Sequence, residues 1–304
     1  AGFGPAAITL TATNTPENKT GYALGILHSA AVAGTICGPL LGGLLADWVG
    51  FGAVFAVMGV SIFIAAMIVL FFVREQFTKQ ESKKKTNLLQ DFKTIAAAKP
   101  LVPLFVSSFL IRSAVIGTLP IIPLYVQQLA VGSNHLALLA GVTAAAMGVS
   151  NMIAAPRLGK FGDKIGSHYI FIAAVAGAIM FTIPQAFVQT LWQLIILRLC
   201  TGISIAGLMP SLNVLIRKHA PKGMVSRTFS YSNCAMFIGG LAGSVGMGAV
   251  AAQFGLPAIF IVSAGLLLVN YGWMRWTWWR MINGKGGASH VQAEVKNDYR
   301  DERV

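Results

Sequence analysis

The strongest constraint on this chain is a series of apolar runs, most of them long enough to cross a lipid bilayer as an α-helix. A helix needs about 20 predominantly apolar residues to span the hydrocarbon core. Only 11% of the residues are charged, whereas a soluble domain averages about 25%. The ~10-residue alternating segments of a membrane β-barrel do not occur. We therefore predict an all-α membrane protein. The apolar runs, of which the first is too short to span, cover residues 1–13, 22–46, 51–73, 101–126, 137–155, 169–188, 191–216, 228–250 and 257–279.

Positive charge is distributed unevenly between these runs. Twenty-one of the 23 Lys and Arg residues lie in alternate connections or from the end of the last apolar run onwards, and the remaining two, Arg112 and Arg198, lie well inside apolar runs. Because basic residues near span ends mark the cytoplasmic side, we expect the long loop 74–100 and the tail 281–304 to be cytoplasmic. The net charge of +13 is thus a topology signal. A nucleic-acid partner would need this charge on one folded patch and is not expected.

The chain contains an internal repeat at an offset of 205 residues. AGFGP at 1–5 aligns with AGLMP at 206–210, Gly34 with Gly239 and Gly38 with Gly243. Such a repeat predicts two similar halves, an arrangement common in transporters. By symmetry, about three and a half spans are expected to precede Ala1, so that the whole protein would have twelve spans.

The repeat and the charge pattern predict four regions. Residues 1–73 would be the remainder of an N-terminal six-helix bundle, comprising the end of helix four and helices five and six. Residues 74–100 would be a basic cytoplasmic linker, 101–280 a C-terminal bundle of helices seven to twelve, and 281–304 a cytoplasmic tail.

Glycine and proline are concentrated in one span, where they ordinarily destabilise a helix. The pattern consists of Gly25, Gly34, Gly38, Pro39, Gly42 and Gly43. Gly34, Gly38 and Gly42 recur every four residues, so they line one helix face and allow a second backbone to approach closely. Simple helix packing and a tight seam that favours one access state of a transporter are both compatible with this face.

Two motifs carry a family resemblance that extends over the whole chain. The glycine and proline pattern resembles the fifth-helix antiporter motif of drug:proton antiporters in the major facilitator superfamily. A second motif, formed by Gly159, Asp163, Lys164 and Gly166, resembles the second-half copy of that superfamily's G-x-x-x-D-R/K-x-G cytoplasmic loop. Arg198 resembles the second-half echo of the family's fourth-helix Arg motif.

The resemblance implies a major facilitator fold that lacks about its first three and a half helices. It also implies proton-coupled export of small drug-like molecules by alternating access, in the inner membrane of a bacterium. We expect a small-molecule substrate, protons and the lipid bilayer as partners, a monomer, and no cofactor or metal. A substrate-specific sugar or metabolite transporter, and a membrane sensor or scaffold that does not transport, are the alternatives. Enzyme motifs such as H-E-x-x-H and G-x-S-x-G are absent from the sequence, so no enzymatic activity is expected.

Several polar residues are candidates for particular roles. Asp163 can accept hydrogen bonds from a helix N-terminus or pair with a basic group, and we interpret its loop as a latch or as a solvated basic loop. Arg112 lies near the middle of its span and is expected to face a central cavity, unless the span begins later. Arg198 could instead stabilise carbonyl groups of a neighbouring helix. Candidate cavity donors, or alternatively contacts between helices, are Asn151, Asn213 and Asn233.

No carboxylate falls within the middle of an apolar run. Proton coupling needs a titratable group inside the membrane, and His28 is the one candidate that these runs offer, although an inward-packed histidine is the commoner interpretation. The resemblance implies a coupling acid in the first helices of the fold, upstream of Ala1.

Overall fold

A computed structural model describes residues 3–72, 94–95, 97–98, 100–130, 136–221 and 223–283, and it leaves the side chains of 37–54 undescribed. These residues form helices. Six of the helical segments are long and apolar enough to cross a membrane, which confirms the six spans predicted after residue 100. The predicted linker 74–100 and tail 281–304 lie largely outside the described residues.

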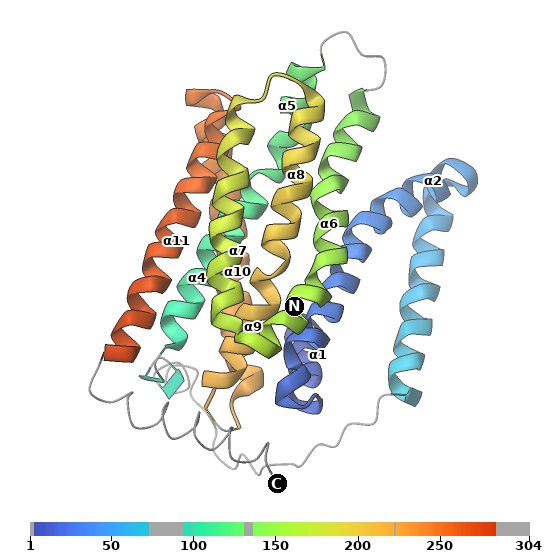
Figure 1. Ribbon diagram of the computed structural model, residues 1–304. Helices are drawn as coiled ribbons and strands as arrows, with labels where there is room; N and C mark the ends of the chain where they lie inside the picture. The colour runs from blue at the N-terminus through green and yellow to red at the C-terminus, as the bar shows by residue number, and fades with distance from the viewer. Residues whose placement is uncertain are drawn as a thin grey trace.

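The elements follow one another along the chain as a succession of helices (Figure 1). Their bounds are α1 Phe3–Asn14, η1 Glu17–Lys19, α2 Thr20–Phe72, α4 Leu101–Gly117, η2 Leu119–Ile121, α5 Ile122–Leu129, α6 Leu136–Ile165, α7 Ser167–Thr182, η3 Ile183–Phe187, α8 Leu191–Ala206, α9 Leu208–His219, α10 Val225–Phe254 and α11 Ala258–Asn283.

Local sequence explains where these helices begin and break. The span 101–126 is interrupted between α4 and α5, because Pro120 and Pro123 lack the amide hydrogen that a continuous helix needs. Thr190 and Gln193 form a capping box at the start of α8. Gly166 joins α6 to α7 with φ of 103°, a conformation that favours glycine.

The element bounds confirm the internal repeat. Both ends of α1 lie 205 residues before the corresponding ends of α9, and the starts of α2 and α10 are separated by the same interval. The copies differ further on, because α10 ends at Phe254 whereas α2 remains helical past the equivalent position. Pro257 follows the break in the second copy, and its equivalent is Gly52, which retains the amide hydrogen of a continuing helix. The ribbon of α2 nevertheless turns back at its upper end (Figure 1).

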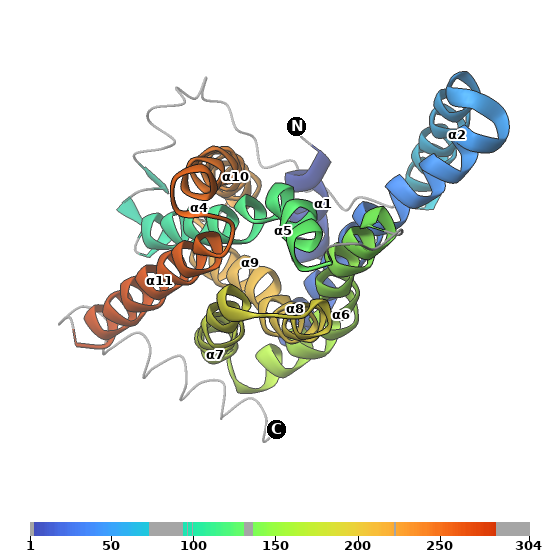
Figure 2. The ribbon, with the colours of Figure 1, turned by 90° about the horizontal axis from the view of Figure 1, so that it is seen from above.

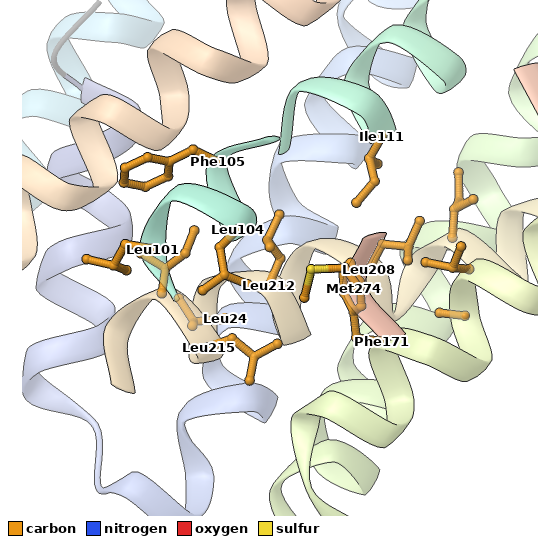
Figure 3. Close-up of a cluster of buried hydrophobic side chains, with 14 of the residues drawn as sticks. Leu24, Leu101, Leu104, Phe105, Ile111, Phe171, Leu208, Leu212, Leu215 and Met274 are labelled. Carbon is orange, nitrogen blue, oxygen red and sulfur yellow. The ribbon is translucent and has the colours of Figure 1, made fainter. Parts of the chain in front are cut away.

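The helices after residue 100 form one bundle, and the part of α2 that follows its turn lies apart from this bundle (Figure 2). Helices α6 and α9 both end at the lower end of the bundle in Figure 1. We call this the basic end, because the last turns of these two helices carry Lys160, Lys164, Arg217 and Lys218. Near it, Leu24 of α2 is buried in the same cluster as Leu104 and Leu215 (Figure 3). The two halves therefore share a hydrophobic core at the basic end.

Candidate transport site between the two halves

Helices α2 and α6 run antiparallel and meet backbone to backbone at the basic end. A Cβ atom on Gly159 would overlap the carbonyl group of Gly21. One on Gly25 would lie 2.6 Å from the carbonyl oxygen of Ala155. Real Cβ atoms do not approach other backbones so closely, so glycine is required at both positions. Gly159 and Gly25 come from the two different sequence motifs, and the structure brings these motifs together in one seam.

The seam widens away from the basic end. The hydroxyl group of Ser29 donates to the carbonyl oxygen of Met152 at 2.7 Å. Further along, Gly148 meets the side chain of Ile36 instead of a backbone. Gly34 has no atom within 4 Å of its Cβ position. The two halves are therefore in closest contact at the basic end and diverge towards the opposite end of the bundle.

Asp163 of α6 bonds to α2 at the narrow end of this seam. Its carboxylate accepts the amide hydrogens of Gly21 at 2.7 Å and Tyr22 at 2.9 Å. These amides belong to the first turn of α2, where no intrahelical acceptor exists and the helix dipole favours negative charge. Of the two roles that the sequence left open for Asp163, the structure shows the helix N-terminus.

Arg217 provides a second connection between the halves that the sequence analysis missed. It extends from the end of α9, where its guanidinium donates to the hydroxyl oxygen of Thr20 and, at 3.2 Å, to the carbonyl oxygen of Thr15. In the sequence, Arg217 is one of several basic residues at the end of an apolar run. Its neighbour Lys218 carries the same charge signal, so the sequence offered no means of distinguishing the two.

Polar side chains from three helices lie together deeper between the halves. The imidazole of His28 on α2 lies beside the side chain of Asn151 on α6 and within range of the charge of Arg112 on α4. Asn151 is 8% exposed. The Nε2 atom of His28 and the Oδ1 atom of Asn151 are both buried without a hydrogen-bond partner. The two side chains interact with each other, and a ligand or water between the halves would complete the hydrogen bonding of these two atoms.

Arg112 is half-buried on α4, and its side chain passes beside Gly240 of α10. Gly239 and Gly243, the repeat copies of Gly34 and Gly38, lie on one face of α10 and are in tight contact with α4. Gly239 approaches the backbone of Phe109, and its carbonyl oxygen accepts the hydroxyl hydrogen of Ser113 at 2.7 Å. The small-residue face of the second copy, on α10, thus packs against a neighbouring helix. The periodicity predicts the same kind of packing for the small-residue face of the first copy, on α2.

The remaining predicted site residues are more dispersed. Asn233 donates to the carbonyl oxygen of Phe229 in its own helix at 3.1 Å, and Asn213 is half-buried on α9. Lys164 is exposed beside Asp163. Arg198 is buried inside the second half, where it bonds a carbonyl group of α6. Gly38, Pro39, Gly42 and Gly43 belong to α2 but lie outside the residues whose side chains are described.

The potential metal ligands in the described part of the chain are its His, Cys, Asp and Glu side chains. Within it, no cluster of three or more His, Cys, Asp or Glu side chains could hold a metal ion. The chemistry that remains between the halves is hydrogen bonding and one or two positive charges, which can bind and release a small molecule.

Comparisons with known proteins agree with this arrangement. The family model described as Major Facilitator Superfamily matches residues 1–189 and 154–292. Multidrug resistance protein MdtG of Dickeya zeae is 38% identical over 275 residues, which cover 90% of this chain and 67% of that protein. The same protein of Salmonella arizonae is 37% identical over 274 residues, covering 90% and 68%.

Among solved structures, a bacterial homologue of the iron transporter ferroportin in the outward-facing state has a TM-score of 0.65. The match covers 90% of this chain and 68% of that one at 14% identity, and so it supports the fold alone. The chain is therefore a multi-pass membrane transporter, not an enzyme, and it belongs to the Major Facilitator Superfamily.

Proposed function

We propose that the protein exports small drug-like molecules from a bacterial cell, in exchange for protons, by alternating access across the inner membrane. In this account the basic end faces the cytoplasm, and the α2–α6 seam is the closed cytoplasmic gate. The observation that supports it most is the pair of hydrogen bonds from Gly21 and Tyr22 to Asp163, because they connect the two halves at the basic end. Similarity to multidrug resistance proteins supports the class of substrate.

Opening this gate requires the hydrogen bonds at the basic end to exchange for bonds to water. Charge-assisted bonds contribute about 1.5–3 kcal/mol each at most, and less where the groups are partly solvated as they are here. The closed state is thus favoured by a few kcal/mol, which is the range in which substrate and protons can shift the balance between two states. The two halves would then separate at the basic end and close at the other.

His28, Asn151 and Arg112 are the groups that an exported molecule would meet between the halves. They supply hydrogen-bonding atoms without partners and a positive charge, surrounded by apolar helices. Such a site can bind amphipathic molecules without requiring one fixed shape.

The test measures efflux of ethidium and drug-stimulated proton movement in everted vesicles that contain the full-length protein. Gly159→Ala is expected to reduce both at least tenfold, because the added methyl group would force α2 and α6 apart. Gly162→Ala is the matched control, since its Cβ atom would meet its nearest neighbours at an ordinary 3.6 Å. Absence of efflux from the unmodified protein would refute the function. Equal activity of the two variants would refute the gate.

A further inference from the structure

Arg198 carries a positive charge that the described part of the protein does not neutralise. Its side chain is 1% exposed. The Nε atom donates to the carbonyl oxygen of Thr143 at 3.1 Å, and Nη2 lies 3.7 Å from the sulfur of Met147, a weak acceptor. A guanidinium has five N–H donors, so most of its capacity is left over.

No described carboxylate can reach this guanidinium. Asp163 is the one acidic residue whose side chain the structure describes, and it bonds Gly21 and Tyr22 at the basic end. It also lies 20 residues along α6 from Thr143, a separation of about 30 Å at the rise of an α-helix. An unpaired buried charge costs several kcal/mol, so a counter-ion or water at Arg198 would be strongly favoured.

A cavity lies against Arg198 in the second half of the protein. Its volume is about 20 Å³, more than the 10–15 Å³ that one water molecule requires. Helices α4, α6, α7, α8 and α11 and the 3-10 helix η3 contribute to its walls. None of the lining residues belongs to α2, so the cavity is separate from the α2–α6 seam. Its polar lining consists of Thr118, Thr182, Gln185, Arg198, Thr201 and Ser263.

Most side-chain donors of this lining are already engaged with protein acceptors. The Thr201 hydroxyl donates to the carbonyl oxygen of Leu197, and the Gln185 amide donates to the Thr201 hydroxyl. Ser263 donates to the carbonyl oxygen of Ala114. The guanidinium, and with it the Thr182 hydroxyl of the lining, supplies the donors that remain for an occupant. The full positive charge of the guanidinium selects an anion over a neutral molecule.

We propose that the cavity beside Arg198 binds one small monovalent anion, chloride under cellular conditions. A chloride ion is larger than a water molecule, and the cavity likewise exceeds what one water molecule requires. It would neutralise Arg198 within the space that the lining encloses. The site is structural, and it does not depend on which molecule the protein exports.

The first experiment measures thermal unfolding of the purified full-length protein in potassium gluconate, with chloride substituted at constant ionic strength. The Tm is expected to rise by about 5 °C and to saturate, because a ligand that binds only the folded state stabilises it. The rise should be absent in Arg198→Gln and partly retained in Arg198→Lys. Arg157→Gln removes an exposed arginine and should retain the full rise.

A second variant decides the outcome if Arg198→Gln does not fold. Ala114→Val keeps the guanidinium but fills part of the cavity, and the chloride-dependent rise should fall by at least half. Crystals grown with bromide should show an anomalous peak beside the guanidinium. A Tm that is equal in gluconate and chloride, a rise that persists in Arg198→Gln, or a water molecule without an anomalous peak would each overturn the proposal.

Discussion

The carboxylate of Asp163 lies 2.7 Å from the amide nitrogen of Gly21, although 142 residues separate them along the chain. Asp163 lies near the end of the second span of the second half, and Gly21 lies near the start of a span of the first half. A single side chain thus ties the two halves of the transporter together at the basic end.

Replacing Asp163 tests this connection. In Asp163→Asn the charge is lost and one oxygen acceptor remains, so the closed gate should be weakened by about 1.4 kcal/mol, a tenfold change in the balance between states. We expect the initial rate of ethidium efflux to change by about this factor. Lys160→Gln, an exposed change one turn away on α6, should leave the rate unaltered. Identical kinetics for the Asp163 variant and the unmodified protein would argue against a latch.

Arg217 and Asp163 hold the same segment of chain, so their contributions should not be additive. Arg217→Gln should reduce efflux, whereas Lys218→Gln, its exposed neighbour, should not. In the double variant of Arg217 and Asp163 the loss should fall short of the combined losses by at least 0.5 kcal/mol. Strict additivity of the two effects on efflux rate would show that the contacts act independently.

The small-residue face of α10 should be required for stability. A Cβ atom on Gly243 would lie 2.6 Å from the Cα atom of Ser113, whereas Gly246 has no atom within 4 Å. Gly243→Ala should therefore lower the Tm by several degrees, since overpacking costs about 1–3 kcal/mol. Gly246→Ala should leave the Tm unchanged or raise it slightly. Thermal unfolding of both variants in the same detergent makes the comparison, and equal Tm values would contradict it.

Arg112 is expected to be accessible to water between the halves. In a protein whose native cysteines are replaced by serine, Arg112→Cys should react with a membrane-impermeant maleimide when the gate opposite the basic end is open. Ile238→Cys, at a position 60% exposed on the apolar surface of α10, should face lipid and react poorly. Complete protection of the cysteine at position 112 in every condition would place it outside the transport path.

Much of the fold could be predicted because it depends on composition and period. The six spans after residue 100, the break near Pro120 and the repeat all follow from apolar length, proline chemistry and recurring glycines. Such signals are local, and lipid imposes them on any spanning helix.

The contacts of the site could be predicted only in part. Asp163 was identifiable from its motif, but its partners are backbone amides, which every residue other than proline possesses. Gly21 therefore gave no signal of its own. Arg217 was hidden among basic residues that the positive-inside rule also explains. The first-half helices differ from the second-half copy where Gly52 replaces proline, a local change whose effect on the helix end depends on packing.

The most direct test of the gate measures distances between spin labels by double electron–electron resonance in the cysteine-replaced, full-length protein. Labels at Tyr22 and Phe161, which are 43% and 56% exposed, report on the seam, and labels at Phe161 and Ser230 report within the second half. We predict that a proton gradient or an exported drug adds a longer distance for the first pair and leaves the second unchanged. A single, unaltered distance for the first pair in a protein that still transports would contradict the account.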